Sequence, residues 1–186
     1  PAMTYCSTAF SVINANLKPV LVDTEPFKPT IDASKIKKKI TSKTKVIMPV
    51  HLYGSAANLN AIKKIIKKNS IFLIDDCAQA HGTIDDSNTT YNKKIGSTAD
   101  ISCFSLYPGK NLGAYGDAGI ITTNNKKFYN MIKSLRNLGS TKKFIHDHIG
   151  VNSRLDTVQA IILNKKLKYL KKLNLKKRKI ANLCNK

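Results

Sequence analysis

Short apolar segments alternate along this chain with amphipathic segments whose outer positions carry lysine. The segments Val46–Val50, Ile71–Ile74 and Ile101–Phe104 are short and largely apolar. Between the first two, Asn58–Lys68 repeats apolar residues at helical spacing with lysines opposite, and Asn58 is a suitable N-cap. Strands that alternate with helices build a mostly parallel and buried sheet. The pattern therefore predicts an α/β fold with a mostly parallel sheet flanked by helices.

The same alternation predicts further strands at Pro19–Asp23 and Ile120–Thr123, and helices at Ala33–Ile40 and Phe128–Leu138. Gly139 would end the last of these helices, because glycine is favoured just after a helix C-terminus. The polar stretch Asp85–Lys94 is predicted as a loop. From Leu155 to about Cys184 the pattern is helical, amphipathic and very basic, as in a long connecting helix.

The formal net charge of +21 raises the question of a nucleic-acid-binding protein. Of the 32 basic residues, 29 are lysine and three are arginine, whereas recognition of bases and phosphates relies heavily on arginine. Much of the charge is concentrated in Lys165–Lys186, which holds ten basic residues and no acid. Binding of nucleic acid is therefore an alternative that the composition does not favour.

The chain has four widely spaced cysteines, Cys6, Cys77, Cys103 and Cys184. With no CxxC pair among them, the pattern favours reduced thiols in a cytoplasmic protein over a disulfide framework or a zinc site. His146 and His148 form an HxH pair, but no further ligand stands nearby, so we interpret this pair as part of a surface loop. No stretch approaches the roughly 20 apolar residues of a membrane span. We expect neither a metal site nor a membrane partner.

Polar side chains follow three of the predicted strands. His51 comes directly after Val46–Val50, Asp75 and Asp76 after Ile71–Ile74, and Ser105 after Ile101–Phe104. In parallel α/β sheets, ligands gather outside the carboxyl ends of the strands. Each residue taken singly is compatible with ordinary turn chemistry, but three such ends together indicate a functional site.

Lys110 stands alone in the loop FSLYPGKNLGAYGDAG at 104–119. A Walker loop needs a glycine five residues before its Gly-Lys pair and Ser or Thr after it, but Phe104 and Asn111 occupy those places. The glycine spacing does not form GxGxxG either, so both nucleotide-binding loops are excluded. Two interpretations of Lys110 remain: a lysine that bonds to a cofactor aldehyde, and a lysine that merely lies in a turn.

A pyridoxal phosphate enzyme needs such a lysine, a carboxylate facing the pyridinium nitrogen, donors for the phosphate and a flat group against the ring. Lys110, Asp76 and Ser105 supply the first three kinds, and Tyr5 in the opening PAMTYCS supplies the fourth. By charge alone Asp75 would serve as well as Asp76. A core role for Tyr5 and a turn role for Ser105 also stay open.

Several motifs occur together and in a fixed order: PAMTYCSTAFSVINANLKPVLVD at 1–23, PVHLYG at 49–54, DDCAQAHG at 75–82, the lysine loop at 104–119 and GVNSRLDTVQA at 150–160. Together they closely resemble the DegT/DnrJ/StrS-type family of sugar aminotransferases, a branch of the aspartate aminotransferase fold (fold type I). The resemblance runs from Pro1 to about the end of the chain.

The resemblance implies a role for three residues at the centre of a pyridoxal 5′-phosphate site. Lys110 matches the lysine that bonds to the cofactor aldehyde and later moves a proton between substrate and cofactor. Asp76 matches the acid that pairs with the pyridinium nitrogen, which settles the choice between the two aspartates by register. Gln79 matches the residue that hydrogen-bonds to the ring hydroxyl.

Three further residues match positions around the cofactor. Ser105 matches a phosphate ligand, and Tyr5 occupies the position whose aromatic ring stacks on the cofactor. Asn152 matches the asparagine that reaches the phosphate of the neighbouring subunit's cofactor. The resemblance thus implies a homodimer with shared active sites.

The implied activity is a ping-pong transamination that moves an amino group from glutamate to a keto sugar nucleotide, as in polysaccharide biosynthesis. The lysine loop is most similar to members that act on dTDP-linked 3-keto-6-deoxyhexoses, with 4-keto sugar nucleotides as the alternative. A degenerate member kept as a binding or regulatory module is disfavoured by the intact motifs. Residues 1–154 would form the large cofactor-binding domain without its N-terminal part. Residues 155–186 would lead to an absent small domain, so we expect a chain truncated at both ends.

Overall fold

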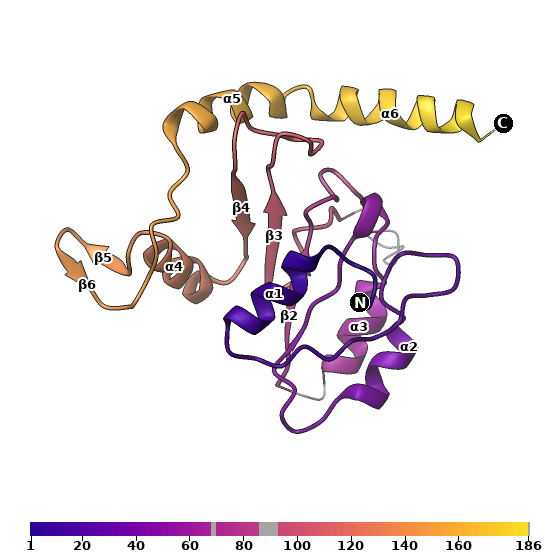
Figure 1. Cartoon of the computed structure of the whole chain (residues 1–186), viewed down its shortest axis with the longest axis horizontal. Helices are drawn as coiled ribbons and strands as arrows, with labels where there is room; N and C mark the ends of the chain where they lie inside the picture. Colours follow the sequence, from indigo (N-terminus) through magenta and orange to yellow (C-terminus); the bar gives the residue numbers. More distant parts are fainter. Residues whose placement is uncertain (68–69, 86–92, 186) are drawn as a thin grey trace. The chain divides into compact units, whose positions relative to one another are not determined.

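The computed structural model describes residues 1–67, 70–85 and 93–185, and the chain forms two compact units (Figure 1). The first unit is Pro1–Phe104 and the second is Ser105–Lys186. Most of the loop predicted at Asp85–Lys94 lies outside the described residues. Among the described residues, no helix is long and apolar enough to cross a membrane. The predicted boundary between a large domain and a connecting helix at residue 154 stays a prediction.

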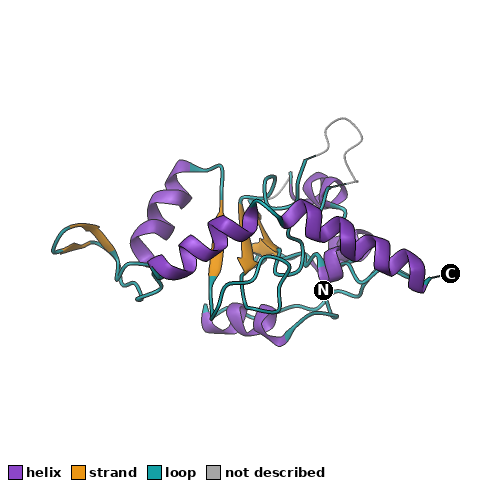
Figure 2. Ribbon diagram, turned by 90° about the horizontal axis from the view of Figure 1, so that it is seen from above, coloured by secondary structure: helices purple, strands orange, loops and turns teal. Residues whose placement is uncertain are grey.

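A parallel sheet forms the centre of the first unit, shown in orange in Figure 2. Its strands are β1 (Val46–Ile47), β2 (Phe72–Asp76) and β3 (Ile101–Ser105). Both β1 and β3 pair with β2 in parallel, so that Ile47 lies opposite Leu73 and Asp76 lies opposite Cys103. The predicted parallel sheet is confirmed.

Two of the predicted strands differ in the structure. Pro49 has no N–H to donate to a neighbouring strand, so β1 ends early and the pairing returns only as an isolated bridge between Val50 and Asp76. The strand predicted at Pro19–Asp23 is wrong. Within it, the carbonyls of Val22 and Asp23 accept hydrogen bonds from the N–H groups of loop residues rather than from a strand.

The described part of the first unit contains three α-helices and two short 3₁₀ helices. They are α1 (Cys6–Asn14), α2 (Ala33–Ile36), the short 3₁₀ helices η1 (Lys37–Lys39) and η2 (Leu52–Gly54), and α3 (Leu59–Ile66). The Asn58 side chain accepts a hydrogen bond of 2.9 Å from the N–H of Ala61, which confirms the predicted N-cap. Leu59 and Ile62 are fully buried and pack with Leu73 of β2 in the core. Helix α3 thus covers the sheet with the face that the sequence predicts.

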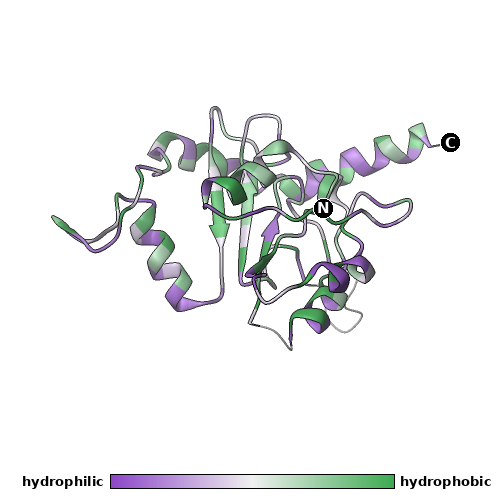
Figure 3. Ribbon diagram, turned by 60° about the horizontal axis from the view of Figure 1, so that its bottom comes forward, coloured by the Kyte–Doolittle hydropathy of each residue, from purple (hydrophilic) through white to green (hydrophobic). Residues whose placement is uncertain are grey.

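The second unit contains β4 (Gly119–Thr122), α4 (Lys126–Leu135), β5 (Ser140–Lys142), β6 (Ile145–His146), α5 (Thr157–Leu167) and α6 (Leu170–Cys184). Helix α4 begins two residues earlier than predicted, because the Asn125 side chain accepts from the N–H groups of Lys127 and Phe128. The predicted long basic segment forms two helices, and apolar and polar residues alternate along α6 (Figure 3).

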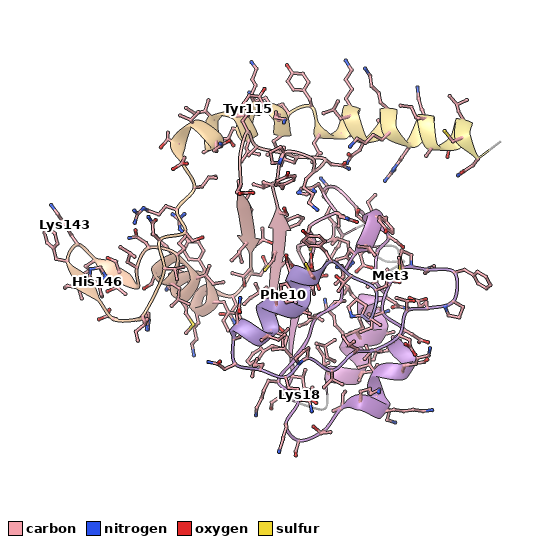
Figure 4. All side chains as sticks on the ribbon, in the orientation of Figure 1. Met3, Phe10, Lys18, Tyr115, Lys143 and His146 are labelled. Atoms are coloured by element: carbon pink, nitrogen blue, oxygen red, sulfur yellow. The ribbon has the colours of Figure 1, made fainter. Side chains whose placement is uncertain are left out.

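A β-hairpin that the sequence did not predict lies at the HxH pair. Strands β5 and β6 pair in an antiparallel hairpin, which carries Lys143 and His146 (Figure 4). His146 and His148 are both exposed, as predicted, and Nδ1 of His146 lies 3.0 Å from the Leu138 carbonyl.

Candidate active site

Asp76 lies at the end of β2, and hydrogen bonds fix both its backbone and its carboxylate. Its N–H donates to the Pro49 carbonyl, and its own carbonyl accepts from the N–H of His51. The carboxylate oxygen Oδ2 accepts a 2.7 Å hydrogen bond from the Thr8 hydroxyl, and Oδ1 accepts from the Ala78 N–H at 3.0 Å. Each oxygen retains a second lone pair. The half-buried carboxylate can therefore accept one more proton donor, such as a pyridinium N–H.

Gln79 is oriented by a strained turn. Its side-chain oxygen Oε1 accepts a 2.6 Å hydrogen bond from the N–H of Tyr53, a residue with φ of 55°. A positive φ is uncommon for a residue that carries a Cβ. Since the Tyr53 N–H fixes the carbonyl end of the amide, the orientation of its NH₂ group is set, and this group can donate to a ligand. Such a donor suits a ring hydroxyl or phenolate oxygen.

The neighbouring aspartate has a different environment. Asp75 is fully buried, and its Oδ2 lies 3.5 Å from Nε2 of the fully buried His51 and 3.4 Å from the Ser102 hydroxyl. A buried side chain directed into the core cannot reach a ligand at the strand end. Asp75 is thus the less accessible of the two aspartates, and the choice of Asp76 stays a prediction.

His51, Asp75 and Cys77 bring three potential metal ligands within 4.8 Å of one another. The backbone N–H of Ala57 donates to Nδ1 of His51 at 3.0 Å, so Nδ1 has no proton and Nε2 must carry it. Nε2 then offers no lone pair to a cation. We interpret this cluster, within the part of the chain that the structure describes, as a structural support under Asp76.

The lysine loop folds back on itself in the second unit. The N–H of Lys110 donates to the Tyr107 carbonyl, and the N–H of Ala114 donates to the Leu106 carbonyl. A Cβ on Gly113 would lie 2.3 Å from the Pro108 carbonyl oxygen, so this close approach requires glycine. The fold of the loop leaves Lys110 partly buried at its turn.

Helices α5 and α6 hold the lysine loop in place. The Asn111 side chain bonds to Asn174 at 3.0 Å and also accepts from Lys177, both of α6. From α5, Gln159 accepts from the N–H of Tyr115 at 2.8 Å, and Lys166 lies 5.3 Å from the Tyr115 ring centroid (Figure 4). Part of the basic segment thus has a structural task that sequence reasoning missed.

The remaining predicted site residues have polar groups available for a further bond, or are exposed. Among the residues that the structure describes, none forms a hydrogen bond or ion pair with the Lys110 ammonium. The Ser105 hydroxyl oxygen accepts a 3.3 Å bond from the Tyr107 N–H, which leaves its proton free for a phosphate oxygen. Tyr5, the N-cap residue of α1, is 72% exposed, and Asn152 is also exposed.

Each unit by itself offers groups of the kinds that pyridoxal phosphate requires. Asp76, Gln79 and Tyr5 belong to the first unit, and Ser105, Lys110 and Asn152 belong to the second. The first unit offers an acceptor for a ring N–H and a donor for a ring oxygen. The second offers a hydroxyl proton and an amine that has no partner among the residues that the structure describes.

The two inner cysteines should resist alkylation in the folded protein. Burial, reinforced by the two carboxylates of β2, raises the pKa of the Cys103 thiol to about 11, and the same causes raise the pKa of Cys77. Thiolate is the reactive form, and roughly one Cys103 in a thousand is ionised at pH 8, so Cys103 should be alkylated slowly. Iodoacetamide followed by peptide mass spectrometry should find label on the exposed Cys6 and Cys184. All four should be labelled in denaturant, and native labelling of Cys103 as fast as Cys6 would contradict the expectation.

Comparison with known proteins bears on the whole chain. The DegT/DnrJ/EryC1/StrS aminotransferase family matches residues 1–186. A dTDP-3-amino-3,6-dideoxy-α-D-galactopyranose transaminase of Aneurinibacillus thermoaerophilus is 47% identical over 182 residues, which cover 97% of this chain and 48% of that protein. The chain thus spans about half the length of the curated relatives it matches.

Solved structures show the same fold. The crystal structure of DesV of Streptomyces venezuelae, in complex with a ketimine intermediate, superposes with a TM-score of 0.87 at 35% identity and covers 92% of this chain and 45% of that one. NtdA of Bacillus subtilis, solved with bound cofactor PMP, has a TM-score of 0.77 at 32% identity, with 91% and 38% covered. The predicted α/β fold of the fold type I aminotransferases is confirmed.

Proposed function

The chain belongs to the DegT/DnrJ/EryC1/StrS aminotransferase family, and from this premise we propose that it is part of a pyridoxal 5′-phosphate-dependent sugar-nucleotide aminotransferase. The proposal rests on which hydrogen-bonding groups of the matched side chains remain available for a ligand. Asp76 can accept one more donor, the Gln79 NH₂ group can donate, and the Lys110 amine has no partner among the described residues. The acceptor of Asp76 suits the ring nitrogen, the donor of Gln79 suits the ring oxygen, and the amine of Lys110 suits the aldehyde of the cofactor.

When bound, pyridoxal phosphate supplies a ring that accepts the electrons of the substrate carbanion. Asp76 keeps the proton on the ring nitrogen, because its negative charge stabilises the pyridinium. Gln79 donates to the ring oxygen, and Ser105 donates to the phosphate. Lys110 would hold the cofactor through its aldehyde carbon, and its amine would take and return the proton at the substrate carbon.

Two residues extend the proposed site. The exposed ring of Tyr5 would stack on the flat cofactor and shield one face from water. Asn152 would reach the phosphate of a second copy's cofactor, as the family resemblance implies. The proposed active form is therefore a homodimer, in the cytoplasm, with shared active sites.

We propose a dTDP-linked 3-keto-6-deoxyhexose as acceptor and glutamate as donor. The name of the 47% identical relative supports a 3-amino product on a dTDP sugar. The donor is the one usual in the family that the motifs resemble. The chemistry at Lys110 is the same for a 3-keto or a 4-keto acceptor, so the position aminated depends on how the sugar is held.

The full-length protein, supplied with pyridoxal phosphate and glutamate, should convert the 3-keto sugar nucleotide to its amine. Mass spectrometry of the nucleotide product would detect the exchange of oxygen for an amino group. The matched 4-keto isomer, at the same concentration, should react at least about tenfold more slowly, since a misplaced carbonyl loses its orientation. Turnover of the 4-keto isomer alone would overturn the proposed acceptor and leave the proposed reaction intact.

A further inference from the structure

We propose that Thr8 is a positioning residue for the Asp76 carboxylate, and that Thr4 assists it through a chain of hydroxyl groups. The proposal rests on the proposed function, in which Asp76 holds the proton of the ring nitrogen. Thr8 belongs to none of the roles that the family motifs imply. Its assignment comes from the hydrogen bonds of the first unit.

The geometry places a buried hydroxyl against the carboxylate. Thr8 lies in the first turn of α1 and is 8% exposed. Its Oγ1 donates to Oδ2 of Asp76 at 2.7 Å, and Oγ1 of Thr4 lies 2.8 Å from Oγ1 of Thr8. The contact joins residues 68 positions apart in the chain, so it depends on the packing of α1 beside the end of β2.

The direction of the hydrogen bonds among Thr4, Thr8 and Asp76 follows from counting their protons. A threonine hydroxyl has one proton, and an ionised carboxylate has none to give. Thr8 therefore donates to Asp76, and Thr4 must donate to Thr8. Hydrogen bonds in such a chain polarise one another, and one that ends on a charged oxygen is stronger than a neutral one.

The consequence is a fixed carboxylate plane. The χ2 torsion of an aspartate, which sets the plane of its carboxylate, has only a weak preference of its own. In Asp76 the Thr8 hydroxyl holds Oδ2 and the Ala78 N–H holds Oδ1, so donors at both oxygens select one orientation. A carboxylate fixed in advance needs no reorganisation when the pyridinium N–H arrives.

The test compares variants of the full-length enzyme. Thr8→Val keeps the shape and removes the hydroxyl, whereas Thr8→Ser restores it. Ser11→Ala is the matched control, because Ser11 of α1 donates to the Thr8 carbonyl but not to Asp76. Thr4→Val removes only the outer hydroxyl and keeps the proposal testable if Thr8→Val fails to fold.

Two readouts separate positioning from folding. Loss of one hydrogen bond to a charged group should weaken pyridoxal phosphate binding and slow the glutamate half-reaction by roughly 10- to 100-fold in Thr8→Val. NMR of cofactor labelled with ¹⁵N at the ring nitrogen should show less of the protonated form. Thr4→Val should shift both readouts in the same direction by a smaller factor, and Thr8→Ser and Ser11→Ala should match the wild type.

If Thr8→Val and Thr4→Val both match Ser11→Ala while Asp76→Asn is impaired, the positioning role is wrong and the proposed function stands. If Asp76→Asn itself behaves as the wild type, the assignment of Asp76 fails, and the positioning role fails with it. An unchanged ¹⁵N signal in a slow, correctly folded Thr8→Val would also overturn the positioning role.

Discussion

Replacing Lys110 by alanine should lower transamination by about 10⁴-fold, the upper range for a positioned acid–base group, because the same amine also holds the cofactor. The amine has no partner among the described residues, and its loop is tied to α5 and α6. Its loss should therefore leave the fold of the loop intact. Turnover of a keto sugar nucleotide with glutamate measures the effect.

Two controls distinguish bonding from charge. Lys165→Ala removes an exposed lysine of α5 and should keep wild-type turnover. Lys110→Arg keeps the positive charge but cannot bond to an aldehyde carbon, because guanidinium stays protonated. We expect it to be as inactive as Lys110→Ala. Substantial turnover in Lys110→Arg would show that the position supplies charge alone.

Asp76→Asn should lower turnover by roughly 10²- to 10³-fold, the usual effect of losing one preorganised electrostatic partner. An amide carries no charge to keep the proton on the ring nitrogen. Thr8 and Ala78 each donate to one oxygen of Asp76. In the variant, one of these two donors would face the NH₂ group of the amide instead of an oxygen. The rate of the glutamate half-reaction, followed by the absorbance of the cofactor, measures the loss.

The adjacent aspartate provides the control. Asp75 is fully buried, and an amide there can still present its oxygen to Ser102 and His51. Asp75→Asn should therefore keep turnover within about threefold of the wild type. The reverse ranking of the two variants would assign the pyridinium to Asp75 and contradict the register taken from the family.

The strands and helices that the sequence predicted well carry their own local signals. Asn58 caps α3 because its side chain can reach the free N–H of Ala61, and the apolar residues after it face the sheet. By contrast, Pro19–Asp23 has the composition of a strand. A strand needs a partner, and its carbonyls bond to loop residues instead. Composition cannot reveal which partner a segment finds.

Much of the candidate site was predicted only through the family motifs, and its support was not predicted at all. Nothing in the sequence distinguishes Thr8 from the other hydroxyl residues near it, since its contact with Asp76 spans 68 positions. The same is true of Asn174 and Lys177, which lie in a lysine-rich helix and hold Asn111 beside Lys110. Contacts of this kind depend on tertiary packing, which no local pattern encodes.

The central claim is that Lys110 bonds to pyridoxal phosphate and takes part in transamination. The most direct test is the visible spectrum of the full-length protein with pyridoxal phosphate, before and after glutamate, beside the Lys110→Ala variant. The wild type should show the absorbance of the cofactor joined to a lysine, and glutamate should convert it to the amine form. The variant should lack the first band. A wild-type protein that binds the cofactor without this band, or a variant that retains it, would contradict the claim.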